Sequence, residues 1–149
     1  MLTHDNKILG FQDEHRWLSN FTMCYVEFER MIYPSTEHAY QAAKTDDEFL
    51  RQHIQGLKLP VEAKRAGKEI TLRLDWTDRL KLEIMADLQR QKYNQPYFKE
   101  LLLATGDAYI EETNYWGDKF WGVCRGVGKN HLGNIIMNIR DELRKELLS

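Results

Sequence analysis

Residues 35–44 read Ser-Thr-Glu-His-Ala-Tyr-Gln-Ala-Ala-Lys, and this stretch predicts a short, well-capped helix. Pro34 precedes it, the Ser35 hydroxyl can accept a hydrogen bond from a free backbone amide, and the alanines favour helix. At about 100° per residue, one stripe of this helix carries Glu37, Tyr40, Gln41 and Lys44. The alanines take the other side. The helix can therefore approach its neighbours closely while it presents a carboxylate, an amide and an amine to the same space.

Two interpretations of this stripe are open. A Glu, a Gln and a Lys on one helical face most often form a solvated surface with weak pairing between residues about one turn apart. Alternatively, the three groups belong to a functional site, and the small alanine face packs against the rest of the protein. The second interpretation needs support from elsewhere in the sequence.

Composition limits the classes of protein that fit. The chain has 149 residues, 42% of them hydrophobic and 11% aromatic, which suits one compact domain over residues 1–149. The net charge is −2, so a broad basic surface for nucleic acid is not visible. Two cysteines far apart in the chain, Cys24 and Cys124, argue for a reduced protein. Residues 1–7 lack a signal-peptide core, and no stretch has the length of a membrane span. We expect a cytoplasmic protein that has no contact with a membrane.

The expected elements are mainly helices. Beside the helix over residues 35–44, the patterns predict helices over 46–56, 60–67, 77–93, 96–104 and 131–147. A hairpin around Glu29, between residues 24 and 33, is the only strongly β region, and brief strands are expected over 7–11 and 108–112. The predicted fold class is mainly α, or α+β with a few short strands near the N-terminus.

A long loop over residues 113–130 is the second informative feature. A loop of this length in so small a domain is usually functional or disordered, and its tryptophans, Trp116 and Trp121, argue against disorder. Its end, residues 125–130, reads Arg-Gly-Val-Gly-Lys-Asn directly before a helix. Free backbone amides, a helix dipole and two cations at that point suit a phosphate. A flexible glycine turn is the alternative, because the spacing matches neither a Walker loop nor a dinucleotide fingerprint.

Several other chemistries find little support. The five histidines show no metal-ligand spacing, so we expect no metal and no cofactor. His38 is expected to be packed or hydrogen-bonded within its helix. A serine nucleophile elbow is absent from the sequence. Cys124 is a possible thiol nucleophile, although a small buried filler is the more common role for such a residue.

The sequence resembles the NADAR family of YbiA-like N-glycosidases along nearly its whole length. The motifs that carry the resemblance are Trp17-Leu18-Ser19-Asn20-Phe21, Tyr33-Pro34-Ser35 with residues 37–44, Asp75-Trp76, residues 102–107, Asp118 with Phe120-Trp121-Gly122, and Gly128 with Asn130, Leu132-Gly133 and Met137. The resemblance implies a compact, single-domain, YbiA-like helical fold. It also implies a hydrolase that acts on N-glycosyl bonds of phosphorylated ribosides. Family substrates are ribosylaminopyrimidine phosphates of riboflavin synthesis and ADP-ribose linked to guanine in DNA.

The resemblance also implies site residues. Catalytic roles are expected of Glu37, Lys44 and Asp118. Trp76 and Trp121 are also implied by the resemblance, with Asn20 and Asn130 as nearby candidates. Together with residues of the helical stripe and of the neighbouring motifs, the full set of expected substrate-binding residues is Ser19, Asn20, Tyr40, Gln41, Trp76, Trp121, Gly122, Lys129 and Asn130. One departure from the family pattern bears on phosphate and leaving-group contacts, because the segment between Trp121 and Asn130 is shorter than in many members.

The chemistry of glycoside cleavage fits these residue types. Breaking the bond between ribose C1 and nitrogen builds positive charge on the sugar, so it needs a carboxylate near C1 and a proton donor for the departing nitrogen. Glu37 and Asp118 can supply both, in an order that the sequence leaves open. Lys44 can instead attack C1 of an opened sugar and form a Schiff base, if burial lowers its pKa. Trp76 and Trp121 offer flat faces to a base or to the cationic sugar.

Two substrate classes and one alternative function follow. A ribosylaminopyrimidine phosphate and ADP-ribose on guanine present the same target, a ribose joined through an amine to an amino-oxo pyrimidine ring. One pocket can therefore serve either, and ADP-ribosylated DNA would be engaged through its modified base. The alternative is a non-catalytic module that binds ADP-ribose or a nucleotide.

Overall fold

A computed structural model describes residues 6–149, and within it the chain divides into two compact units. The central unit is Asn20–Lys92, and the terminal unit combines the chain up to Ser19 with Tyr93–Ser149. The expectation that residues 1–7 lack a signal-peptide core falls largely outside the described residues. The single domain expected from the sequence stays a prediction, and each unit is described by itself.

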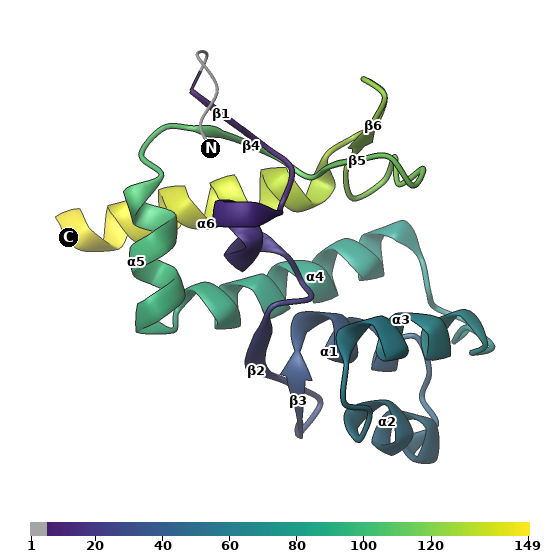
Figure 1. The fold of residues 1–149 in the computed structure, drawn as a ribbon. Helices are drawn as coiled ribbons and strands as arrows, with labels where there is room; N and C mark the ends of the chain where they lie inside the picture. The colour runs from purple at the N-terminus through teal and green to yellow at the C-terminus, as the bar shows by residue number, and fades with distance from the viewer. Residues whose placement is uncertain (1–5) are drawn as a thin grey trace. The chain divides into compact units, whose positions relative to one another are not determined.

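The central unit combines one β-hairpin with four helices (Figure 1). Strands β2 (Met23–Phe28) and β3 (Met31–Ser35) pair antiparallel. Glu29 and Arg30 turn the chain between them with φ values of 46° and 73°, as tight hairpin turns require. The helices are α1 (Thr36–Ala42), α2 (Glu48–Gln55), α3 (Pro60–Lys68) and α4 (Asp78–Tyr93). The predicted hairpin is confirmed.

Helix α1 begins as the sequence predicts and is fixed on both sides of its first turn. The Ser35 hydroxyl accepts a hydrogen bond from the His38 amide at 3.1 Å. The His38 ring lies 2.6 Å from that hydroxyl through Nδ1, and 2.9 Å from the Leu57 carbonyl through Nε2. Burial lowers the pKa of His38. The packed, hydrogen-bonded histidine expected here is confirmed, and it joins α1 to the chain between α2 and α3.

The terminal unit contains two small parallel strand pairs and two packed helices (Figure 1). Strand β1 (Lys7–Leu9) pairs with β4 (Tyr109–Glu111), and β5 (Thr113–Asn114) pairs with β6 (Val123–Cys124). Helix α5 (Pro96–Ala104) packs against α6 (His131–Leu148). A 3-10 helix, Asp13–Leu18, follows β1. Fully buried aliphatic side chains of this unit are Ile8, Leu18, Leu102, Ile110 and Ile136.

Three expectations need correction. Residues 113–130 are not a loop without secondary structure, because β5, β6 and a pairing of Cys124 with Val127 lie inside it. The 3-10 helix was not expected, because six residues are too few to show a helical period. Helix α2 begins at Glu48 rather than residue 46, since Asp47 Oδ1 accepts hydrogen bonds from the Phe49 and Leu50 amides and so forms the cap.

The predicted fold class is confirmed: the chain is mainly helical, with a few short strands. Among the described residues, no helix combines the length and the apolar character that a membrane crossing needs.

Lys92, in the last turn of α4, is fully buried. Burial lowers its pKa to about 7, and the neighbouring Cys24 thiol opposes that shift. In the unfolded chain a lysine keeps its proton up to about pH 10.4. Between these two values the unfolded state binds more protons than the folded state, so the free energy of unfolding should rise with pH across this window.

Replacing Lys92 with methionine should therefore stabilise the protein most at pH 7 and below. The gain should shrink by about 1.4 kcal/mol per pH unit above pH 7, because the wild-type lysine is then buried without its charge. Urea unfolding of both proteins between pH 6.5 and pH 9 checks this. Lys58→Met, at an exposed lysine of the same unit, is the matched control. Equal slopes for wild type and Lys92→Met would contradict the expectation.

Candidate active site

The stripe of large groups on α1 is buried. Glu37, Tyr40 and Gln41 expose 8%, 7% and 5% of their surface, and only Lys44, just beyond the helix, is half-buried. Gln41 Nε2 donates a hydrogen bond of 2.6 Å to Glu37 Oε2. The solvated-face interpretation of this helix is therefore wrong. A nearly buried carboxylate is held in one orientation by an amide one turn away.

Asn20 fixes the start of α1 from the other side. Its carbonyl accepts a hydrogen bond from the Glu37 amide at 3.2 Å, and its side-chain Oδ1 accepts one from Gln89 Nε2 at 2.6 Å. Gln89, on α4, is fully buried, and its Oε1 has no hydrogen-bond partner in the structure. Sequence reasoning missed Gln89. The available signal was a glutamine beside Met85 and Leu88 on the buried stripe of that helix.

Lys44 lies beside a pair of aromatic rings that contact each other at a tilt. Its Nζ is 5.6 Å from the centre of the Tyr40 ring, and the Tyr40 and Trp76 ring centres are 5.6 Å apart at an interplanar angle of 53°. Burial lowers the pKa of the Lys44 ammonium, and the Glu37 carboxylate only partly opposes this. The four residues combine an acid, an amine of lowered pKa and aromatic surface in one place.

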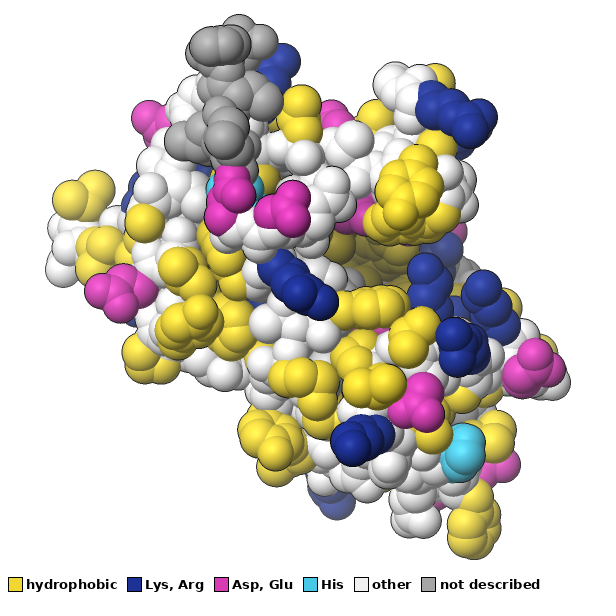
Figure 2. Space-filling view, viewed as in Figure 1, with side chains coloured by type: hydrophobic (Ala, Val, Ile, Leu, Met, Phe, Trp, Pro, Cys, Tyr) yellow, Lys and Arg dark blue, Asp and Glu magenta, His cyan; other side chains and the backbone are white. Residues whose placement is uncertain are grey.

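Three further lysines surround Lys44, and sequence reasoning missed them. Lys64 and Lys68 lie one turn apart on α3, and Lys81 lies on α4. All three lower the pKa of Lys44 by charge repulsion. Lys64 Nζ is 6.0 Å from the Phe21 ring centre. Figure 2 shows Lys and Arg side chains gathered over α3. The cluster combines Lys44 with lysines of α3 and α4. Because these three segments are separate in the sequence, no run of basic residues marks the cluster.

Gly67 lets α3 approach α1 at the site. A Cβ atom at this position would overlap Gln41 Oε1 and its Cδ. Gln41 is the residue that holds Glu37, so the glycine is needed for the position of the carboxylate. Gly67 was expected to end this helix, but it lies inside α3, whose C-cap is Glu69, so its role is in packing.

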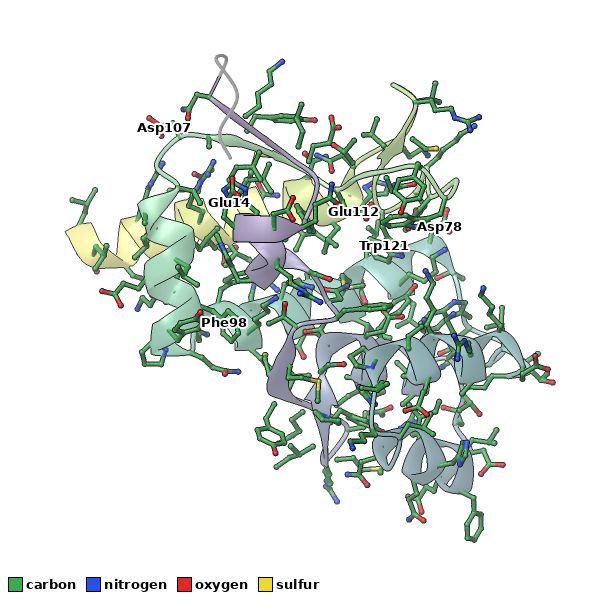
Figure 3. The ribbon with its side chains drawn as sticks, in the orientation of Figure 1. Glu14, Asp78, Phe98, Asp107, Glu112 and Trp121 are labelled. Carbon is green, nitrogen blue, oxygen red and sulfur yellow. The ribbon has the colours of Figure 1, made fainter. Side chains whose placement is uncertain are left out.

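In the terminal unit, Asp118 organises the segment between β5 and β6. Its Oδ1 accepts hydrogen bonds from the Phe120 and Trp121 amides at 3.1 and 2.9 Å. Its own amide donates to Asn114 Oδ1 at 3.0 Å, and Asn114 Nδ2 donates to its carbonyl at 2.8 Å. The turn so formed carries Trp121, which is labelled in Figure 3. Asp118 therefore holds its loop through one oxygen, whatever chemistry the other oxygen performs.

Asn130 and Gly122 tie this segment to β4 and α6. Asn130 has φ 52°, and its side chain accepts from the Glu112 amide and donates to the Ile110 carbonyl, both at 3.0 Å. The Gly122 carbonyl accepts from the Asn130 amide at 3.2 Å. A Cβ atom at Gly122 would overlap the Glu112 carbonyl, so no larger residue fits there without a shift. Both residues position the loop.

Several backbone amides at the start of the last helix are already hydrogen-bonded within the protein. The amides of residues 129–132 donate to the carbonyls of Lys119, Gly122, Phe120 and Trp121, at 2.9 to 3.2 Å. These four amides therefore have protein partners, and a phosphate site over residues 125–130 stays a prediction. Lys129 is exposed, and its predicted contact with substrate stays a prediction.

The structure thus brings together six predicted site residues in the central unit: Asn20, Glu37, Tyr40, Gln41, Lys44 and Trp76. The other six belong to the terminal unit: Ser19, Asp118, Trp121, Gly122, Lys129 and Asn130. A common pocket for Glu37 and Asp118 stays a prediction. Within residues 6–149, no group of three or more His, Cys, Asp or Glu side chains is placed to hold a metal ion.

The NADAR domain matches this chain over residues 8–144. The chain belongs to the NADAR family. It is 33% identical over 141 residues to the N-glycosidase YbiA of Escherichia coli (strain K12), covering 90% of this chain and 85% of that protein. It is 35% identical over 136 residues to an N-glycosidase of Nostoc punctiforme, covering 87% and 86% of the two proteins.

Two further likenesses complete the comparison. A riboflavin biosynthesis protein of Vibrio vulnificus is 36% identical over 138 residues, and this chain spans only 37% of its length. The NMR structure of the Escherichia coli protein YbiA matches with a TM-score of 0.83 and 32% identity, over 96% of this chain and 86% of that one. The family predicted from the motifs and the YbiA-like fold are confirmed.

Proposed function

We propose that this NADAR protein is an N-glycoside hydrolase that cleaves the bond between ribose C1 and nitrogen in a phosphorylated riboside. The prediction of an enzyme acting on N-glycosyl bonds agrees with the names of relatives that align over most of the chain. The observation that carries the proposal is the α1 cluster. It combines a buried, oriented Glu37 carboxylate with the Lys44 amine, whose pKa burial lowers, and with a pair of aromatic rings.

In the proposed reaction, Glu37 faces the sugar carbon at which positive charge develops. A carboxylate that is shielded from water and fixed by Gln41 stabilises that charge more strongly than a solvated one. Lys44, in its neutral form, attacks C1 of the opened sugar; a proton then passes from the attacking nitrogen to the departing nitrogen, the bond between C1 and the base breaks, and the base leaves as its amine. Water then hydrolyses the resulting imine and frees the lysine. Trp76 and Tyr40 supply the surface against which sugar or base packs.

The lysines around Lys44 support a phosphorylated substrate. The charges of the three other lysines disfavour the charged form of Lys44, and a bound anion beside them would offset this repulsion. A phosphate carries up to two negative charges and binds lysine as a point charge. In this proposal Lys64, Lys68 and Lys81 bind the phosphate and orient the ribose toward Glu37.

The test is a comparison of two substrates on the purified protein. One is a ribosylaminopyrimidine 5′-phosphate, and the other is an oligonucleotide with ADP-ribose on guanine. Release of the pyrimidine base identifies the small riboside, whereas recovery of unmodified guanine identifies the DNA substrate; chromatography and mass spectrometry follow both. Binding of ADP-ribose without release of either product would show that the protein is a binding module and not a hydrolase.

Asp118 offers a separate prediction, because asparagine keeps the oxygen that accepts the two loop amides and removes only the charge. As the second catalytic carboxylate, Asp118→Asn should lower kcat by about 100-fold with an unchanged melting temperature. Asp118→Ala should also lower the melting temperature, since both hydrogen bonds are lost. Full activity in the asparagine variant would limit Asp118 to holding its loop.

A further inference from the structure

A cavity of about 410 Å³ lies within the terminal unit, between the segment that follows β5 and the turn at the end of β6. It is lined by Tyr115, Trp116, Gly117, Lys119, Cys124, Arg125 and Val127. Its volume falls in the range of sites that take small organic ligands. None of the predicted catalytic or substrate-binding residues lines this cavity, so it needs an account of its own.

Two tight turns shape the cavity. Gly117 has φ 89° and turns the chain between Trp116 and the Asp118 turn. On the other side, Cys124 and Val127 exchange backbone hydrogen bonds of 2.8 and 3.0 Å, and Arg125 and Gly126 form the bend with φ values of 53° and 78°. The paired bend places Arg125 at the rim on a fixed backbone. The cavity is therefore built by the regular hydrogen bonding of this segment.

The aromatic wall of the cavity is unusually exposed. Tyr115 exposes 81% of its surface and Trp116 exposes 53%. Their ring centres are 5.3 Å apart at 77°, so the two rings support each other edge to face. Figure 2 shows hydrophobic side chains and Lys or Arg side chains together over the β5–β6 region. A tryptophan left this exposed is typical of a surface on which a planar ligand stacks.

The charge of the cavity is positive. Lys119 and Arg125 are both exposed, and none of the seven lining residues is acidic. An arginine and a lysine beside aromatic faces suit a phosphate joined to a planar ring, because the cations hold the anion while the ring stacks. A purely apolar ligand would leave both cations unused, and a bare phosphate would leave the aromatic wall unused.

We propose that this cavity is a nucleotide site, in which a base stacks on Trp116, which Tyr115 supports edge to face, while Lys119 and Arg125 bind its phosphate. The nucleotide can be the adenosine portion of an ADP-ribosyl group or a nucleotide next to a modified base in a strand. Both sources present the same chemistry to the site. The proposal concerns binding and does not require the cleavage reaction, so the two can fail separately.

The test is calorimetric titration of the protein with AMP, with adenosine, with ribose 5-phosphate and with a short single-stranded oligodeoxynucleotide. Trp116→Ala should weaken binding of AMP or of the oligonucleotide by about tenfold, as loss of one stacked base does. Arg125→Gln should weaken the same ligand and should not affect adenosine. Tyr97→Ala, at an exposed tyrosine on α5 outside the cavity, is the matched control and should bind as wild type does.

The arms distinguish the source of the nucleotide. Trp116-dependent binding of AMP alone assigns the site to the adenosine portion, and Trp116-dependent binding of the oligonucleotide alone assigns it to a strand. Either result supports a nucleotide site. Three results would overturn the proposal. Neither AMP nor the oligonucleotide binds, or wild type and Trp116→Ala bind them equally, or Trp116→Ala weakens the binding of ribose 5-phosphate by the same factor.

Discussion

Glu37→Gln should lower kcat for glycoside cleavage by about 1,000-fold or more, with little change in substrate affinity or in melting temperature. The variant keeps the size of the side chain and an oxygen that can accept the Gln41 hydrogen bond of 2.6 Å. It removes only the negative charge, which in the proposed reaction acts on the transition state more than on the bound substrate. Such a loss appears in kcat and leaves KM nearly unchanged.

The measurement is the rate of base release under saturating substrate, beside the melting temperature of each variant. Glu69→Gln is the matched control, because it removes one carboxylate from the exposed end of α3 in the same unit. That control should retain wild-type kcat. An active Glu37→Gln protein would end the role proposed for this carboxylate, and an unfolded one would show that the charge serves stability instead.

The helix at the site could be predicted from sequence because its signals are local. Ser35 caps the first turn, the alanines favour helix, and one turn brings Gln41 back to the face of Glu37. The helix ends at Ala42, so the helix predicted to reach Lys44 is too long at that end. Its burial could not be predicted. A stripe of Glu, Gln and Lys is typical of a solvated face when the helix is considered alone. Here α3 covers the stripe, and the close approach of α3 to α1 depends on Gly67 of α3.

The segment after β4 shows the opposite case. Composition predicted an ordered, site-forming loop over residues 113–130, but the internal order of this segment comes from contacts that leave no periodic pattern. A few hydrogen bonds between individual residues build each of its features, namely the Asp118 turn, the two-residue strands and the Asn130 bridge to Ile110. Likewise, only folding brings Lys44 near the three other lysines, Lys64, Lys68 and Lys81, so no short stretch of the sequence contains these four cations.

Lys44→Met should abolish turnover, with a loss of about 1,000-fold or more, because in the proposed reaction the amine forms a covalent bond with C1. Borohydride added during turnover should trap a protein–sugar adduct in the wild type, visible by mass spectrometry at Lys44, and no adduct in Lys44→Met. Lys58→Met, at an exposed lysine of the same unit, is the control and should form the adduct at the wild-type rate. Turnover without any trapped adduct would reject the imine and leave Lys44 an electrostatic role.

The pH profile tests the same amine by a second route. Burial and the charges of Lys81, Lys64 and Lys68 lower the pKa of Lys44, so its reactive neutral form is present at lower pH than in an exposed lysine. The rate should therefore rise with pH through this lowered pKa. Lys64→Met with Lys81→Met removes two of the repelling charges, so the rise of kcat should move to higher pH, whatever the loss in phosphate affinity does to KM. A rise that stays at the wild-type pH in this double variant would show that a group other than Lys44 controls the rate.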